Sequence, residues 1–293
     1  MRVGIIDVGS NTVRLLAAER GSEGVYPLRE ERRQVGLGET IERRGSITSA
    51  KLNETARTAR EYAKLARRLE CHRLEVVVTA PGRQSGNARE LLRALDRAVG
   101  VTPRVLSAES EGRLADIGAV AAAGPQPGMI AVCDVGGGST EIAFGEGQAE
   151  PEWVDSIDIG SLRLTGRFFN QRGSSAGAVR AARREVRMHL EEVAGAAPDH
   201  ALAAGGSARG LRKLVGRTLG PEELEEALGL LTGRNPSKIA RKHGLDPRRA
   251  HTLLAGAVIL TEVQAMLGVP FEVARGGLRE GLACELLAER QAA

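Results

Sequence analysis

Two short segments of the chain combine the residue types that bind phosphate through backbone groups. Each has an apolar run, then Asp-Val-Gly, then small polar residues, over residues 3–12 and 130–140. A glycine that follows a strand can present its backbone N–H groups in a concave nest, which binds anions without a side-chain cation. The residues that would surround a phosphate in this way are Gly9, Ser10, Asn11, Thr12, Gly136, Gly137, Gly138, Ser139 and Thr140.

Asp7 and Asp134 end the two apolar runs, shortly before these glycines. Since a carboxylate repels phosphate, its presence at this position makes sense when a divalent cation lies between the two anions. Hairpin turns are also rich in Gly, Asn, Asp and Ser, so either segment alone is typical of such a turn. Two segments in the same register favour the phosphate site.

Other cofactor and metal motifs do not occur in the sequence. It has no G-x-x-x-x-G-K-[ST] string, which excludes a P-loop, and no G-x-G-x-x-G that opens a first strand-helix-strand unit, which argues against a Rossmann site. The three cysteines, Cys71, Cys133 and Cys284, lack the spacing of zinc ligands or of a disulfide scaffold.

Charge and hydropathy argue against two further classes of protein. The 293 residues include 41 Lys and Arg and 37 Asp and Glu, and a net charge of +4 is not that of a dedicated nucleic-acid binder. We find no apolar run near the ~18 residues that cross a bilayer, and no signal-peptide pattern. We therefore expect a cytoplasmic protein without a membrane or nucleic-acid partner.

Strand and helix patterns alternate along the chain, as in α/β proteins. The expected strands are 3–7, 13–18, 74–79, 101–107, 129–133, 141–144, 201–204 and 271–274. The expected helices are 48–69, with Ser49 as a possible cap, 88–99, 111–122, 178–193 and 281–290, and the pattern over 222–267 is mostly helical.

The two Asp-Val-Gly segments look like copies of one strand-turn-strand unit. Residues 124–128, Gly-Pro-Gln-Pro-Gly, are the best linker candidate between them. An internal duplication of this kind suggests two similar domains that face each other. We expect a first domain over residues 1–123 and a second over 129–281.

Several strings, in the same order and over nearly the whole chain, resemble segments of one protein family. They are residues 7–15, 79–87, 106–114, 134–141, 156–165 and 276–281. On these strings the chain is similar to the exopolyphosphatase / guanosine pentaphosphate phosphatase (Ppx/GppA) family, in its short, two-domain type. The resemblance implies two α/β domains of the actin-like (ribonuclease H-like) type with a cleft between them, the first completed by a C-terminal helix at 282–293.

The resemblance also implies roles for particular residues. Glu111 takes the position of the base that orients and deprotonates the attacking water, and Arg83 stabilises charge on the transferred group. Asn87 would hold Arg83 or the substrate. Mg²⁺, or another hard divalent cation, would lie near Asp134, Glu141 and Asp7.

The implied reaction releases terminal orthophosphate from inorganic polyphosphate, from guanosine pentaphosphate, or from both, and the implied assembly is a homodimer. The match has departures. Ser110 stands where the family usually has an acid, and Pro81 and Gly82 are unusual in the segment of Arg83. Arg163, and likewise Arg279, lies in a weaker matching segment and is equally well explained as part of a structural ion pair.

Three other functions stay open from the sequence. A small-molecule kinase of the same superfamily would phosphorylate an added acceptor, and a non-catalytic sensor would bind polyphosphate or an alarmone without releasing phosphate. Residues 237–251 also look like a helix-turn-helix, with basic residues and a central glycine. DNA binding through this segment would give a gel shift at moderate salt.

Overall fold

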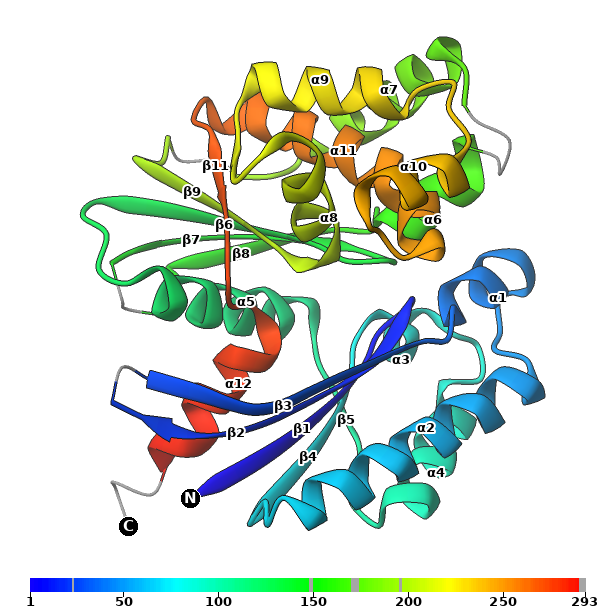
Figure 1. Ribbon diagram of the computed structural model, residues 1–293, viewed down its shortest axis with the longest axis vertical. Coiled ribbons are helices and arrows are strands. Elements are labelled where there is room, and N and C mark those ends of the chain that lie inside the picture. Colours follow the sequence, from blue (N-terminus) through cyan, green and yellow to red (C-terminus); the bar gives the residue numbers. More distant parts are fainter. Residues whose placement is uncertain (23, 148–149, 170–173, 195–196, 290–293) are drawn as a thin grey trace.

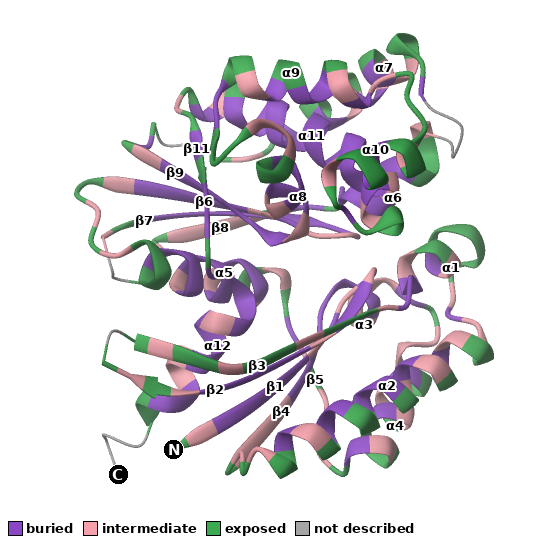
Figure 2. Ribbon diagram, in the orientation of Figure 1, coloured by how far each residue is buried: buried purple, intermediate pink, exposed green. Residues whose placement is uncertain are grey.

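The computed structural model describes residues 1–22, 24–147, 150–169, 174–194 and 197–289 of the chain. Within these residues the strands form two sheets, each in its own lobe (Figure 1). Two helices, α5 (Ala108–Ala123) and α12 (Leu278–Ala288), lie between the sheets. Buried residues concentrate in the sheets and in the helices that pack against them (Figure 2).

The first lobe is built on a mixed sheet with the strand order β3-β2-β1-β4-β5. The first three strands form an antiparallel meander, and β4 and β5 run parallel to β1. The strands are β1 (Arg2–Val8), β2 (Thr12–Gly21), β3 (Gly24–Gln34), β4 (Arg73–Val78) and β5 (Arg104–Val105). The helices of this lobe are α1 (Leu37–Arg44), α2 (Ser49–Arg68), α3 (Ala80–Gln84) and α4 (Ala88–Val99).

The second lobe has the strand order β10-β11-β9-β6-β7-β8. Again a hairpin, here β6 and β7, joins a parallel neighbour, β9. The strands are β6 (Met129–Val135), β7 (Thr140–Glu146), β8 (Trp153–Ile157), β9 (His200–Ala204), β10 (Thr218–Leu219) and β11 (Phe271–Val273). The helices are α6 (Ser161–Phe168), α7 (Ala176–Leu190), α8 (Gly205–Val215), α9 (Pro221–Leu231), α10 (Pro236–His243) and α11 (Pro247–Leu267).

Helices α5 and α12 join the lobes by crossing between them. α5 packs on the second sheet, although it precedes that sheet in the chain, and α12 returns from the second lobe to pack on the first sheet. The two backbones touch, because a Cβ on Gly118 would overlap the carbonyl oxygen of Gly277 and one on Gly281 would overlap that of Leu114. Only glycine allows this approach.

The two expected copies have the same hairpin geometry. In the first lobe Gly9 N donates to Thr12 O at 3.0 Å, and in the second Gly136 N donates to Ser139 O at 3.1 Å. Val8 pairs with Val13 before the first turn, as Val135 pairs with Thr140 before the second. The duplication read from the sequence is therefore a real structural repeat.

Most expected elements are present, and the differences are local. The strand over 101–107 is confined to Arg104–Val105, and the cap of α2 is Thr48, whose hydroxyl accepts from Lys51 N at 3.4 Å, rather than Ser49. The expected closing helix ends at Ala288, and residues 290–293 lie outside the described residues. The sequence prediction missed β3, β8, β10, α1, α3, α6 and α8.

One helix contradicts the expectation that no apolar run approaches the length needed to cross a bilayer. In the described part of the chain, α11 alone is long and apolar enough to cross a bilayer, with a mean hydropathy of 1.4 over 18 residues. However, 83% of that stretch is buried inside the protein, so α11 is a core helix of the second lobe (Figure 2). Its apolar side chains pack against other helices on several sides, which explains why the helix is apolar all round.

Candidate active site

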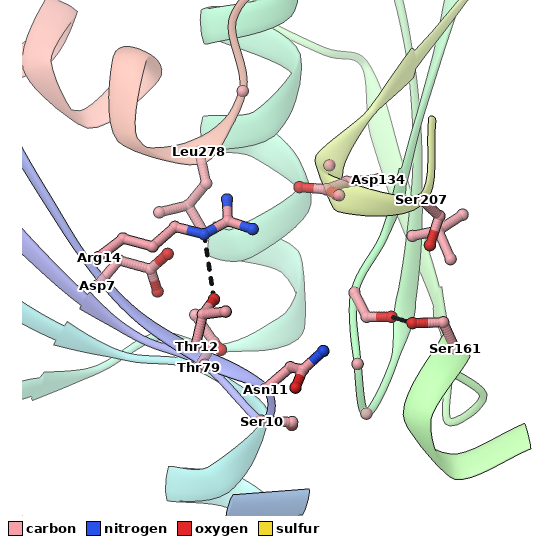
Figure 3. Close-up of a pocket in the computed structure, with 18 of the residues that line it drawn as sticks. Asp7, Ser10, Asn11, Thr12, Arg14, Thr79, Asp134, Ser161, Ser207 and Leu278 are labelled. Atoms are coloured by element: carbon pink, nitrogen blue, oxygen red, sulfur yellow. Dashed lines mark hydrogen bonds between the residues drawn. The ribbon is translucent and has the colours of Figure 1, made fainter. Parts of the chain in front are cut away.

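A cavity of about 110 Å³ lies between the two hairpin turns and is called here the cleft cavity. Figure 3 shows it with Asp7, Ser10 and Asn11 on one side and Asp134 on the other. Every residue of both turns lines it, that is Gly9, Ser10, Asn11 and Thr12 with Gly136, Gly137, Gly138 and Ser139. The structure thus brings the two expected phosphate loops together.

The turns approach each other closely enough to hold one anion from both sides. A Cβ on Gly138 would lie 2.8 Å from Ser10 Oγ, and one on Gly137 would lie 3.1 Å from Ser10 Cβ. Helix α6 supports the second turn from below, since Ser161 Oγ donates to Gly136 O at 3.0 Å (Figure 3). Thr140, in contrast, does not line the cavity, because its hydroxyl donates to Ile159 O at 2.6 Å in the core.

Asp7 and Asp134 line the cleft cavity from opposite lobes (Figure 3). Burial raises the pKa of both carboxyl groups, Arg14 lowers both, and the charge of Asp134 raises the pKa of Asp7 further. Neither carboxylate accepts a hydrogen bond from the described residues. Gly205 makes room for Asp134, because a Cβ there would overlap Asp134 Oδ1.

This arrangement fits a hard divalent cation. Mg²⁺ is usually held by one or two carboxylates together with substrate phosphates, rather than by a complete cage of protein ligands. Asp7 and Asp134 supply such oxygens beside a nest for phosphate. No group of three or more acidic, His or Cys side chains in metal-binding geometry occurs among the described residues, so Asp7, Asp134 and Glu141 do not form one ligand set.

Glu111 enters the cleft cavity from the first turns of α5. The residue is only 8% exposed, and burial raises the pKa of its carboxyl group to about 7. The charges of Asp134 and Asp7 act in the same direction, whereas Arg83 lowers the pKa. A carboxylate with a pKa near neutral and access to a phosphate site is suited to accept a proton from water.

Arg83, on the short helix α3, holds the Glu111 carboxylate. Its Nη1 donates to Glu111 Oε2 at 2.8 Å and to Leu106 O at 2.9 Å. Its Nη2 donates to Ser139 Oγ at 3.4 Å and lies 3.8 Å from Glu141 Oε1. Arg83 therefore joins the base to the second hairpin and is not itself among the cavity-lining residues.

Glu141 lies behind the cavity rather than on its wall. It is 1% exposed, accepts a hydrogen bond from Ser156 Oγ at 3.1 Å, and packs against Gly112 of α5. Burial and the nearby Glu111 charge raise the pKa of its carboxyl group. In this structure Glu141 contacts Arg83, and the expectation that it lies with Asp7 and Asp134 at one cation does not match its position.

Asn87 also differs from its expected position. Its amide holds the loop before α2, with Oδ1 accepting from Ile47 N at 2.8 Å and Nδ2 donating to Ile47 O at 3.0 Å. Among the described residues it forms no hydrogen bond with Arg83, and it does not line the cleft cavity. Arg83 belongs to α3, whereas Asn87 is the residue before α4, so the four-residue spacing does not place the two side chains on one helix face.

A wall of arginines lies on one side of the cleft cavity, and the sequence prediction had named only Arg279 of it, as a weak candidate. The arginines come from distant segments and are Arg14, Arg32, Arg209, Arg249 and Arg279. Burial, followed by the charge of neighbouring arginines, lowers the pKa of Arg14 to about 9 and that of Arg249 to about 10. Like charges held this close cost free energy unless an anion lies among them.

The strand register explains how part of this wall forms. Arg14 is directly opposite Asp7 on β1, and Arg32 on β3 is directly opposite Arg14. Residues that are opposite in an antiparallel pair point to the same face of a sheet. Alternation along β2 could have placed Arg14 beside Asp7, but Arg32 required the unpredicted strand β3.

The segment with the look of a helix-turn-helix forms another part of the wall. Residues 237–251 are α10, a turn, and the start of α11. Arg249 donates to Gly206 O beside the cavity, and Arg248 Nη1 donates to Gln34 O across the cleft at 3.1 Å. Two of the basic residues in this segment therefore form hydrogen bonds at the cleft between the lobes.

Comparison with known proteins agrees with this geometry. The family model of the Ppx/GppA phosphatase family matches residues 16–290. Exopolyphosphatase 1 of Mycobacterium tuberculosis is 29% identical over 96% of this chain and 87% of its own. The crystal structure of the Aquifex aeolicus Ppx/GppA family member superposes with a TM-score of 0.83 and 29% identity, over 99% and 98% of the two chains. An exopolyphosphatase from Cytophaga hutchinsonii, at 20% identity over 98% of each chain, shares the fold with a TM-score of 0.89.

The fold and the facing phosphate loops place the protein among the hydrolases of phosphoanhydride bonds that have an actin-like fold. Within that class, one family model matches residues 16–290, which is most of the chain. The chain belongs to the Ppx/GppA phosphatase family.

Proposed function

We propose that the protein is an exopolyphosphatase that removes the terminal phosphate of inorganic polyphosphate, with Glu111 as the general base. One observation carries the proposal. The buried, arginine-held Glu111 reaches the same cavity as the two phosphate-type turns. The names of the mycobacterial relatives point to the same substrate class.

The terminal phosphate would lie between the turn of Gly9–Thr12 and that of Gly136–Ser139, where backbone N–H groups and hydroxyls meet it from both lobes. Glu111 would accept a proton from water as the water oxygen bonds to phosphorus. The bond from phosphorus to the bridging oxygen breaks, and its electron pair leaves with the shortened polyphosphate. The products are orthophosphate and a polyphosphate with one unit fewer.

Asp7 and Asp134 would hold Mg²⁺ or another hard divalent cation, which would neutralise charge on the phosphate oxygens when bound. The arginine wall would bind the phosphates behind the scissile bond, since a guanidinium fits two phosphate oxygens at once. Arg83 would act through Glu111, by keeping its carboxylate aimed into the cavity.

A second candidate substrate is guanosine pentaphosphate, and a specific observation favours it. A side cavity of about 560 Å³ adjoins the cleft cavity and shares Asn11, Gln34 and Thr252 with it. Its other walls include apolar Val35, Leu162, Pro236 and Pro247. A space of this size, with amide groups and apolar walls, suits a nucleoside better than a chain of phosphates.

The test is phosphate release from polyphosphates of defined length and from guanosine pentaphosphate, with Mg²⁺ and after its removal by a chelator. We expect Mg²⁺-dependent release of orthophosphate from polyphosphate. Binding of the same polyphosphate without release would support a sensor instead. Release that requires an added sugar or acid as phosphate acceptor would support a kinase.

The assembly and the compartment stay predictions. We propose that the protein is a cytoplasmic homodimer, as the family resemblance implies. Light scattering behind size-exclusion chromatography would give the mass in solution, and a mass of 31.0 kDa, that of a single chain, would contradict the dimer.

A further inference from the structure

The arginine wall continues outward into a second space, called here the outer cavity, of about 210 Å³. It shares Arg14, Arg32, Arg209, Arg249 and Arg279 with the cleft cavity. Its remaining lining residues are acidic, Glu30 and Glu31. A polyanion that extends from the phosphate turns along the arginines therefore enters a space in which two carboxylates join the five guanidinium groups.

The register of strand β3 shows where Glu30 lies relative to the arginines. Gln34 is level with Thr12 at the phosphate turn, Arg32 is level with Arg14, and Glu30 is level with Leu16. Alternate residues of a strand point to the same face, and two residues advance it by roughly 7 Å. On this face the side chains run from the turn as amide, guanidinium and carboxylate.

The Glu30 carboxylate also forms an ion pair with Arg279, which competes with binding of a substrate phosphate by that arginine. Its Oε2 accepts from Arg279 Nη2 at 3.3 Å, and Arg279 is 7% exposed while the Glu30 side chain is 55% exposed. Arg279 donates in addition to Glu280 Oε1 at 3.4 Å and to Leu15 O at 3.3 Å. Arg279, which lines both cavities, is thus already paired with a carboxylate at the exposed Glu30.

We propose that Glu30 is a chain-length selector that disfavours polyphosphates long enough to extend past Arg32. This inference rests on the proposed polyphosphatase function and adds the residue that limits its substrate. Short chains end among the arginines, whereas each further unit of a longer chain places negative charge beside a carboxylate.

The experiment compares tripolyphosphate with a long-chain polyphosphate, in kcat/KM per chain end and in Kd by calorimetry at fixed salt. For Glu30→Gln we expect the ratio of long-chain to short-chain kcat/KM to rise about three- to fivefold, the size of a partly exposed charge contact. Glu30→Lys should raise it further. The matched control is Glu222→Gln on α9, which changes the net charge equally at an exposed residue far from the cleft and should leave the ratio unchanged.

An equal gain for both chain lengths would overturn the selector, because it would show only a general loss of negative charge. An unchanged ratio in both Glu30 variants would also overturn it. The proposed function fails separately, when the wild-type protein releases no phosphate from either substrate. In that case the Kd ratio still tests whether Glu30 discriminates by length.

Discussion

The two hairpins have nearly the same backbone but carry opposite charges at equivalent positions. Asp7 is opposite Arg14 in the first hairpin, and Asp134 is opposite Glu141 in the second. The turns between them close with the same hydrogen bond. The geometry needed to hold a phosphate is therefore common to both copies, and the difference lies in the residue that follows the turn on the second strand.

The charged residue of each hairpin, Arg14 or Glu141, lies near residues of like charge on one of the two crossing helices. Arg14 lies in the wall that includes Arg279 of α12, whereas Glu141 lies near Glu111 of α5 and is joined to it through Arg83. One hairpin thus faces the groups suited to hold a polyanion, and the other faces the groups suited to activate water. Under the proposed mechanism, the two copies of the hairpin would therefore have different chemical roles.

The largest expected effect is on the acidic side of this comparison. Glu111→Gln keeps the shape of the side chain but removes the proton acceptor, so we expect kcat to fall by about 10²–10⁴-fold while substrate binding is retained. Phosphate release and calorimetric Kd, measured on the same preparation, check it. A variant with the wild-type rate would show that Glu111 is not the base.

On the basic side, Arg14→Met should weaken binding and stabilise the fold. Loss of a guanidinium that holds phosphate should lower kcat/KM roughly 10- to 100-fold, mainly through KM. Removing one of several crowded positive charges should at the same time raise Tm, because burial and neighbouring arginines already lower the pKa of Arg14 to about 9. Arg20→Met, at an exposed residue of the same strand, is the control. A lower Tm with an unchanged KM would contradict the anion-binding wall.

The acid limb of the pH–rate profile should report the titration of Glu111, on the acidic side of the site. The pKa of Glu111 is raised to about 7, so kcat/KM should fall up to tenfold for each pH unit below that value, as the base becomes protonated. Because Arg83 lowers the pKa of Glu111, Arg83→Met should move this limb to higher pH. Arg113→Met on α5, which removes ion pairs to Glu150 and Glu285, should not move it. A limb that stays in place in the Arg83 variant would mean that another group titrates.

The smallest effect concerns a second acid on α5. Asp116 is 3% exposed, does not line the cleft cavity, and has a pKa raised to about 7 by burial. A raised folded-state pKa means that its neutral form stabilises the fold below about pH 4 and that this stability is lost as the pH rises through 7. Asp116→Asn should therefore be more stable than wild type at pH 8, on the order of 2 kcal/mol, and about equal near pH 4. Urea unfolding at both pH values checks it, and a pH-independent difference would contradict it.

Much of the site could be predicted because it is local in the chain. Gly9 and Gly136 follow strands directly, so the turn, its anion-binding nest and the preceding aspartate are all written in short segments. Glu111 was found only through the family resemblance, since a glutamate near the start of a helix is ordinary by itself. For Asn87 the resemblance gave the wrong position, because the contact of Asn87 with Ile47 depends on how α2 and α4 pack.

The amino-acid sequence by itself determined the repeat, the alternating α/β elements and the two phosphate turns, because strand alternation and glycine chemistry act over a few residues. Only the tertiary structure decided the rest. The arginine wall gathers residues as distant as Arg14 and Arg279, through the pairing of β2 with β3 and the return of α12 to the first sheet. Such contacts depend on strand register and on the crossing of two glycine-lined helices, and neither is encoded in any short segment.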